Sequence, residues 1–215
     1  MNRVHTNVPQ GQPLLVRTEN FELRSLTPAM ITVDYVSWWN DPQIQSQLGS
    51  KPRGWTIEDA RRHVAKFDNR WNFHLGIYAL NDGHLLGFTS ILANPRTGVS
   101  VSNRVIGDKS YWRKGVSKEL SAWGIPFAFV KLGMSKIKAE IRGANHSSIA
   151  LCEYLGFQRE GLLRSDIPGE KPGERMDVHV YGLLREDWHA MCLRGQFPWQ
   201  PKDIPAYKLE SNIQA

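Results

Sequence analysis

Three strand-like segments follow one another between residues 72 and 108, and this succession constrains the fold more than any other feature. They read NFHLGIYAL, HLLGFTSILA and VSVSNRVIGD. Asn81-Asp82-Gly83 separates the first two, and Asp-Gly between apolar runs is a strong signal for a β-hairpin. A turn over residues 94–98 precedes the third segment. We therefore predict three consecutive antiparallel strands.

The residues before these strands indicate one further strand and then helices. The segment NFELRSL alternates apolar and polar side chains, which predicts the first strand. Residues 27–48 have helical spacing, and Asp41-Pro42 divides them into two short helices because proline restricts the residue before it. Thr56 is predicted to cap a helix that runs to about Asn69.

The residues after the three strands predict a helix and then a second group of strands. The apolar positions of the helix recur at spacings of three and four, at Val116, Leu120, Trp123, Phe127 and Val130. Pro126 should kink this helix, because proline lacks an N–H group, and the helix should stop near Gly133. A strand KIKAEIRG, a helix NHSSIALCEYLGF and strands near 158–163 and 177–184 follow, with DIPGEKPGER as a loop.

These elements predict a single α/β domain, which suits a chain of 215 residues. The sheet is expected to be mixed and mostly antiparallel, with helices on its faces. Residues 1–15 are interpreted as an N-terminal arm, 16–194 as the domain, and 195–215 as an extended tail that contains three prolines.

The segment IGDKSYWRKGVSKEL leads from a strand through a glycine loop directly into a helix. Such a junction directs free backbone N–H groups and the positive end of the helix dipole at one place, where a pyrophosphate can bind. Arg113, Lys114 and Lys118 add positive charge, and Gly115 lets a ligand approach the backbone. The alternative is a polar turn in which the glycine serves geometry alone.

A second motif, NHSSIALCEYLGF, lies about thirty residues further on. Asn145 is a candidate helix N-cap whose amide can also bind the amide of a ligand; the alternative is a cap and nothing more. In this order and spacing, the two motifs resemble those of the GNAT superfamily of acetyltransferases. The branch that they resemble contains ribosomal-protein-type and nucleotide-amino-sugar N-acetyltransferases, and the resemblance covers roughly residues 20–190.

The resemblance implies a sheet that splays after the CoA-binding strand, and acetyl-CoA as the acyl donor. Arg113 stands where this branch usually has glycine, and Ser117 where it has glycine or alanine. The implied acetyl-CoA contacts are Val105, Ile106, Gly107, Trp112, Arg113, Lys114, Gly115, Val116, Ser117, Asn145 and Ser148.

The catalytic candidates are Asp108, Glu140 and Cys152. Amide formation requires a neutral amine and stabilisation of a tetrahedral oxyanion, and the resemblance assigns the latter to a backbone N–H at residues 105–107. Asp108 and Glu140 are the candidate bases, or else exposed, solvated carboxylates. Cys152 aligns with the family's tyrosine, which protonates the departing CoA thiolate. The thiol can donate that proton, act as a nucleophile, or simply pack.

The acceptor candidates lie in SWWNDPQIQSQLG, which resembles a segment of GNAT enzymes that acetylate nucleotide-linked amino sugars. Trp38, Trp39, Asn40 and Asp41 offer stacking faces and polar contacts, unless the tryptophans pack in the core. Arg53 and Arg70 are candidates for an acceptor phosphate.

The predicted function is acetyl transfer from acetyl-CoA to the amine of a nucleotide-linked 6-deoxy amino sugar, in a ternary complex. One alternative is acetylation of a protein or peptide N-terminus. Another, of a different class, is a non-catalytic acyl-CoA-binding module.

Composition narrows the remaining possibilities. The net charge of +6 is spread along the chain, so we expect a small-molecule polyanion as partner rather than nucleic acid. Cys152 and Cys192 lack metal-ligand spacing, so neither a metal site nor a disulfide is expected. Because no apolar run approaches the roughly 18 residues that span a bilayer, we expect a cytoplasmic protein without membrane contact. A homodimer is suggested by analogy alone.

Overall fold

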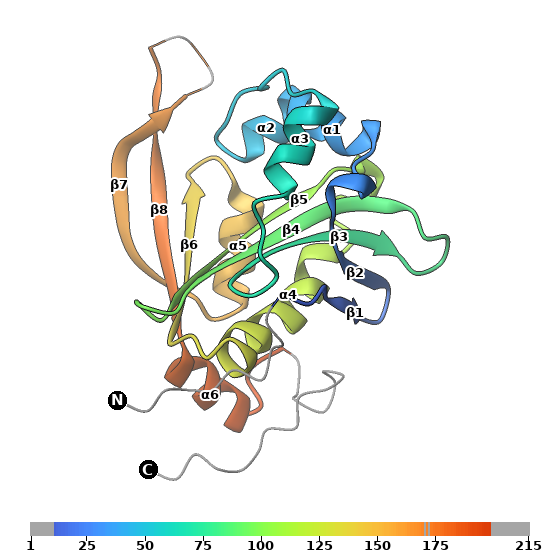
Figure 1. The fold of residues 1–215 in the computed structure, drawn as a ribbon. Helices are drawn as coiled ribbons and strands as arrows, with labels where there is room; N and C mark the ends of the chain where they lie inside the picture. The colour runs from blue at the N-terminus through green and yellow to red at the C-terminus, as the bar shows by residue number, and fades with distance from the viewer. Residues whose placement is uncertain (1–10, 170, 172, 199–215) are drawn as a thin grey trace.

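The computed structural model describes residues 11–169, 171 and 173–198. The described residues form an eight-stranded sheet in the order β1-β2-β3-β4-β5-β6-β8-β7 (Figure 1). The strands are β1 (Leu15–Arg17), β2 (Phe21–Ser25), β3 (Asn72–Ala79), β4 (Leu85–Asn94), β5 (Val99–Ile106), β6 (Lys136–Arg142), β7 (Gln158–Pro168) and β8 (Arg175–Leu184). All neighbouring pairs are antiparallel except β5 and β6, which are parallel. The three consecutive antiparallel strands predicted between residues 72 and 108 are thus confirmed.

Helices cover both faces of the sheet, and none in the described part of the chain is long and apolar enough to cross a membrane. They are η1 (Pro28–Met30), α1 (Val33–Asn40), α2 (Pro42–Gln47), α3 (Ile57–Val64), η2 (Lys109–Tyr111), α4 (Val116–Pro126), η3 (Phe127–Lys131), α5 (His146–Tyr154) and α6 (Arg185–Leu193).

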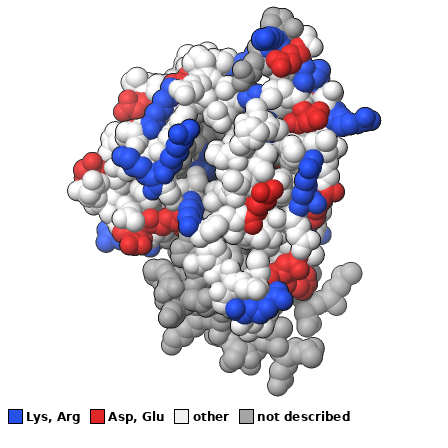
Figure 2. Space-filling view, turned by 180° about the vertical axis from the view of Figure 1, so that it is seen from behind, with Lys and Arg blue, Asp and Glu red and all other residues white. Residues whose placement is uncertain are grey.

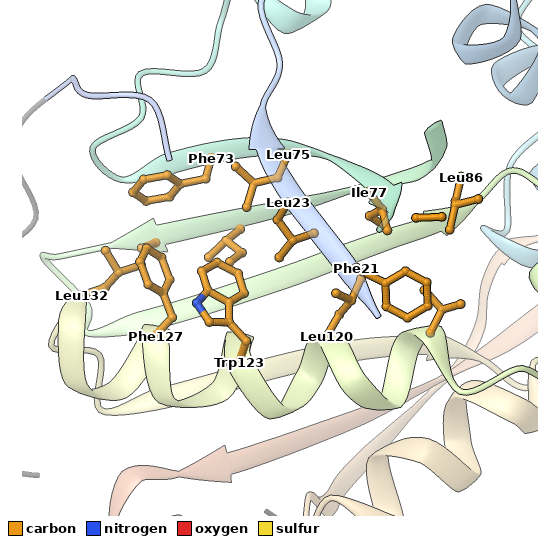
Figure 3. Packing of buried hydrophobic residues seen from close by; sticks show 14 of the residues in the cluster. Phe21, Leu23, Phe73, Leu75, Ile77, Leu86, Leu120, Trp123, Phe127 and Leu132 are labelled. Carbon is orange, nitrogen blue, oxygen red and sulfur yellow. The ribbon is translucent and has the colours of Figure 1, made fainter. Parts of the chain in front are cut away.

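Strand β3 shows why α4 and α1–α3 lie on opposite faces. Side chains alternate along a strand, and Phe73 and Leu75 pack with α4 in one buried cluster. His74, between them, instead meets α1 on the other face, where its Nε2 lies 2.8 Å from the Tyr35 hydroxyl. Figure 3 shows Phe73, Leu75 and Ile77 facing Trp123 and Phe127 of the α4–η3 helical segment. Burial of each such side chain stabilises the fold by about 1.5–3 kcal/mol.

Strands β5 and β6 separate soon after they pair, as the resemblance implied. Their register covers only three residue pairs, from Val99 with Lys136 to Val101 with Lys138. Beyond this point β6 continues beside β8 as far as Arg142, whereas β5 continues beside β4. In Figure 1, β6, β7 and β8 diverge from the rest of the sheet. A wedge therefore opens between residues 102–106 and the end of β6.

The break predicted at Asp41 and Pro42 is confirmed, and its cause is a cap. The Asp41 carboxylate accepts hydrogen bonds from the backbone N–H groups of Gln43 and Ile44, and Pro42 occupies the first turn of α2. This arrangement starts a new helix where α1 ends.

The third predicted helix starts correctly and ends early. Thr56 and Asp59 form a capping box at the start of α3. The helix was predicted to reach about Asn69 but ends at Val64. The reason is Asp68, whose carboxylate accepts hydrogen bonds from the backbone N–H groups of residues 70–72 and so stabilises a turn that leads into β3.

Pro126 alters the helix differently from the predicted kink. The helix continues through the proline and widens into a π-helical turn, η3, in which the Leu132 N–H donates to the Phe127 carbonyl. Proline has no N–H group to donate within the helix, and the wider turn follows it directly. Gly133, with φ of 70°, ends the segment as predicted.

Two predicted boundaries lie elsewhere in the structure. The segment 166–175, predicted as a loop, is strand only at its two ends, because β7 extends to Pro168 and β8 begins at Arg175. The Arg175 guanidinium holds this hairpin by donating to the Ser165 and Asp166 carbonyls. At the C-terminal end, Phe197 is buried against Trp188, so packing onto the domain continues into the segment interpreted as a tail.

Candidate active site

A cavity of about 780 Å³ occupies the wedge between β5 and β6. The start of α4 and one side of α5 line it at one end, and the end of α2 with the β7–β8 hairpin lines it at the other. The sequence-predicted residues that line it are Val105, Ile106, Trp112, Arg113, Gly115, Val116, Ser117, Glu140, Asn145, Ser148 and Cys152. The wedge therefore brings together both sequence motifs.

The loop before α4 leaves its backbone accessible to a ligand, and positively charged side chains surround it. Gly115 is the N-cap of α4 with φ of 81°, and no side chain caps the helix, so the first N–H groups of α4 have no intrahelical acceptor. A Cβ atom at Gly115 would meet no atom within 4 Å. Arg113 also adopts a left-handed conformation, with φ of 62°, although it is not glycine. Lys118 lies nearby, its Nζ 4.1 Å from the centre of the Tyr154 ring.

Some of the Lys and Arg side chains form a cluster on the surface of the protein. Figure 2 shows Lys and Arg side chains grouped beside a hollow on one face, with Asp and Glu side chains more scattered. A hollow with adjacent cations suits an elongated anionic ligand.

Strand β5 presents backbone donors to the wedge. The Gly107 N–H donates to the Leu86 carbonyl of β4 at 2.8 Å. Hydrogen bonds alternate along an antiparallel pair, so the Val105 N–H also faces β4, whereas the Ile106 N–H faces the wedge. The Trp112 indole N–H donates to the Ile106 carbonyl at 2.8 Å and holds the loop against the strand. Of the three predicted oxyanion donors, only Ile106 thus has an available N–H.

Gly107 has a different role, which the sequence alone did not reveal. A Cβ atom at this position would lie 2.1 Å from two atoms of the Trp38 indole. Only glycine therefore lets α1 pack this closely on the end of β5. Gly107 does not line the cavity, and neither does Lys114.

Asn145 joins the two ends of the cavity. Its Oδ1 accepts the Ser148 N–H at 3.1 Å and the Ser147 hydroxyl at 3.0 Å, which makes it the N-cap of α5. Its Nδ2 donates to the Gln47 carbonyl of α2 at 3.1 Å. Both ends of the amide are therefore occupied by the protein itself.

Comparison with known proteins identifies the family. The family model described as "Acetyltransferase (GNAT) domain" matches residues 20–158. The chain belongs to the GNAT family. The uncharacterized N-acetyltransferase YoaA of Bacillus subtilis is 32% identical to this acetyltransferase over 177 residues, 80% of this chain and 97% of that protein. The probable N-acetyltransferase YjcK of the same organism is 27% identical over 140 residues, 62% of this chain and 75% of that protein.

Solved structures agree in fold. Spermidine N-acetyltransferase from Vibrio cholerae, in complex with CoA and spermine, gives a TM-score of 0.71 at 18% identity, covering 80% of this chain and 99% of that one. A GNAT-family acetyltransferase from Bacillus anthracis gives 0.67 at 19% identity over the same shares of the two chains. The solved structures thus show the α/β GNAT fold, and the family model and the relatives identify the chain as an N-acetyltransferase.

In this acetyltransferase, Cys152 lines the cavity and is partly buried. Burial raises the pKa of its thiol to about 11. Burial thus makes this thiol a weaker acid than an ordinary thiol, so proton donation from Cys152 to a departing thiolate is disfavoured. A neutral thiol is also a poor nucleophile. Of the three roles considered, packing is favoured.

We predict that Cys152→Ala keeps kcat within about threefold of the parent enzyme, because the thiol remains neutral and contributes packing alone. Steady-state thiol release from acetyl-CoA measures this. Cys152→Ser, which keeps a hydroxyl, is the matched variant. A loss of a hundredfold or more in both would instead assign Cys152 to the chemistry.

The two candidate bases differ in position. Glu140 lines the cavity and forms an ion pair with Lys138 at 2.6 Å. Asp108 lies outside the cavity lining, accepts the Ser110 N–H at 2.9 Å, and faces His84 at 3.4 Å. Hydrogen bonding to Ser110 lowers the pKa of Asp108, which keeps this carboxylate ionised. Glu140 is therefore the better placed of the two.

The predicted acceptor residues mostly serve the fold. Trp38 is 7% exposed and packs on Phe88. The Asn40 side chain both donates to and accepts from the Trp55 backbone, at 2.9 and 2.8 Å. Asp41 caps α2 and forms an ion pair with Lys109 at 2.7 Å.

Trp39 and Arg53 form an aromatic and cationic group outside the cavity lining. Trp39 stacks on Trp55 with ring centres 4.3 Å apart, and the exposed Arg53 guanidinium lies 5.6 Å from the Trp39 ring. Arg70 is elsewhere, over the Trp71 ring at 5.9 Å.

Sequence reasoning missed several residues of the cavity. Arg104 of β5 lines it, as do Gln47 at the end of α2, Gly49 just after it, and Asp166 on β7. In the sequence, the indication for Arg104 was that a charged residue stands within the predicted strand. Within the described ranges, no group of three or more His, Cys, Asp or Glu residues is placed to hold a metal ion.

Proposed function

We propose that this GNAT acetyltransferase transfers the acetyl group of acetyl-CoA directly to a primary amine that enters the wedge from the side of α2. The observation that carries the proposal is the continuous cavity, which passes between the parted strands from the α4 loop to the β7–β8 hairpin. A donor at one end and an acceptor at the other can meet in it without leaving the protein.

The α4 loop fits the pyrophosphate of the donor. The free N–H groups at the start of α4 and the positive end of its dipole attract two negatively charged phosphates. Arg113 and Lys118 line the same part of the cavity and add positive charge. The open space at Gly115 leaves room for the phosphates against the backbone.

The chemistry then needs few side chains. The amine nitrogen attacks the thioester carbon, and a C–N bond forms while the carbonyl oxygen becomes an oxyanion. The Ile106 N–H is the candidate donor to that oxygen. Glu140, directly or through water, is the candidate acceptor of the ammonium proton. Cleavage of the C–S bond completes the transfer.

For the acceptor, we propose the amine of a nucleotide-linked 6-deoxy amino sugar. The support is the resemblance of the α1–α2 segment to sugar-nucleotide enzymes, together with the Trp39–Trp55 stack and the Arg53 guanidinium, which suit a base and a phosphate. The internal contacts of Trp38, Asn40 and Asp41 leave these three fewer atoms for a ligand.

A cationic amine of another kind is the second candidate. Glu140 and Asp166 place carboxylates around the cavity, and a carboxylate-lined entrance attracts protonated amines. The structures with similar folds include the ribosomal-protein-S5-alanine acetyltransferase from Vibrio fischeri, at a TM-score of 0.67 and 16% identity, as well as the spermidine enzyme. A peptide N-terminus or a polyamine is therefore the alternative acceptor.

The test is thiol release from acetyl-CoA with a panel of nucleotide-linked amino sugars, peptides with free N-termini, and spermidine. We expect saturable turnover with an amino sugar, and an acetylated product by mass spectrometry. Turnover confined to peptides or spermidine would assign the acceptor to the second candidate. An absence of thiol release with every amine, despite CoA binding, would contradict both.

A further inference from the structure

Arg104 is a partly buried cation in the wall of the wedge. Its Nη1 donates to the Ser117 carbonyl at 2.7 Å and to the Ser121 hydroxyl at 3.3 Å, both on α4. Its Nε is buried and has no hydrogen-bond partner among the described residues. Within the same part of the chain, no carboxylate lies within ion-pair distance of it.

This guanidinium remains charged at neutral pH. Burial lowers the pKa of Arg104 to about 10, which is still well above 7. A guanidinium whose Nε is buried without a partner, and whose other partners are neutral, is costly to the fold. Such a group is most easily explained by an anion that the protein meets during its work.

The position of Arg104 indicates which anion this is. The guanidinium bonds the Ser117 carbonyl and the Ser121 hydroxyl, the second and sixth residues of α4, whereas the pyrophosphate is proposed at the first N–H groups of the helix. A helical carbonyl points toward the C-terminal end of its helix, so both acceptors lie beyond those N–H groups and Arg104 lies deeper in the wedge than the phosphates. Cys152 of α5 lines the same cavity as Arg104.

Position 152 is also where the resemblance placed a tyrosine that protonates the departing CoA sulfur. The Cys152 thiol is a weaker acid than CoA itself and cannot favourably supply that proton. Cys152 therefore provides no phenol at this position. Arg104 lines the same cavity from strand β5.

We propose that the Arg104 guanidinium stabilises the departing CoA thiolate by charge and hydrogen bonding, in place of a proton donor. As the C–S bond breaks, its electron pair goes to sulfur, and the ammonium proton goes to the base or to water. No proton need reach the sulfur before CoA leaves. This role rests on the proposed binding of acetyl-CoA in the wedge, and it makes Arg104 a catalytic residue of this chain.

The experiment compares the binding of CoA and of desulfo-CoA, which lacks the sulfur, by calorimetry from pH 7 to 9. A site that stabilises the thiolate lowers the pKa of the bound CoA thiol below that of free CoA. In the parent enzyme, the preference for CoA over desulfo-CoA should therefore grow as the pH rises from the pKa of the bound thiol toward that of the free thiol. A preference that does not change with pH would overturn the proposal without any variant.

The variants locate the effect. Arg104→Gln should abolish the pH-dependent preference, leave the desulfo-CoA affinity within about threefold, and lower kcat about a hundredfold with little change in KM for acetyl-CoA. Arg104→Lys, which keeps the charge, should retain much of the preference. Arg96→Gln, the same substitution at an exposed arginine of the β4–β5 turn, should change nothing.

Other outcomes contradict the proposal in distinguishable ways. If Arg104→Gln weakens CoA and desulfo-CoA equally, Arg104 binds the phosphates and not the sulfur. If the variant retains the parent kcat and preference, Arg104 has no part in catalysis. If the parent enzyme binds neither molecule, the proposed use of the wedge fails before Arg104 is tested.

Discussion

Replacement of Gly115 by glutamate is expected to weaken CoA binding at least a hundredfold. Gly115 is the N-cap of α4, and nothing fills the space where a side chain would extend. A glutamate there would place a carboxylate in the volume proposed for the pyrophosphate, where the two negative charges repel. Calorimetric titration with CoA measures the loss, and circular dichroism checks that the helix persists.

Gly115→Ala separates charge from backbone strain. Both variants must adopt a φ near 81°, which costs a residue other than glycine roughly 1–2 kcal/mol. Arg113 shows that this loop tolerates a side chain in the left-handed region. We expect the alanine variant to bind CoA within about tenfold of the parent protein. If the glutamate variant binds CoA as well as the alanine variant does, the loop does not hold the pyrophosphate.

Phe73→Ala is expected to lower the free energy of unfolding by about 3–5 kcal/mol, the largest stability effect predicted for this chain. Phe73 is fully buried and meets the Phe127 ring edge-to-face, with ring centres 5.3 Å apart. Its removal leaves a cavity between β3 and the α4–η3 segment (Figure 3). Denaturant unfolding followed by tryptophan fluorescence gives the change.

Leu92→Ala on the neighbouring strand is the matched control. Leu92 is 37% exposed and faces Asn72, the residue next to Phe73 in the chain, across the β3–β4 pair. Its truncation should cost less than about 1 kcal/mol. Equal losses in the two variants would mean that the cluster around Phe73 does not dominate stability.

The regular part of the fold could be predicted because its signals are local. The Asp82-Gly83 turn, the alternation of β3 to β5 and the capping box of Thr56 each act over a few residues. The errors arose where a distant or unusual contact decided the outcome. The Asp68 carboxylate ended α3 early, and the Arg175 side chain extended the β7–β8 hairpin into a segment rich in proline and glycine.

The site could be predicted less well, because sequence motifs show where residues lie but not what they contact. Trp38 and Asn40 looked suited to a ligand and instead pack on Phe88 and bond Trp55. Conversely, Arg104 belongs to no motif. The role that we propose for it depends on its contacts with α4 and its place in the cavity wall, which only the folded structure shows. The backbone direction that selects Ile106 over its neighbours depends on the β4–β5 register.

The early separation of β5 and β6 gives this protein a sheet edge in its interior. An exposed edge strand is a hazard, because its free N–H and C=O groups can pair with another protein chain. Residues 102–106 carry such groups along one side, and these groups face the wedge, which β6 and the helices α4 and α5 also line. A folded polypeptide cannot pair there, but a thin, flexible chain with amide groups can. The unpaired edge is thus available to a small molecule but not to a strand of another protein chain.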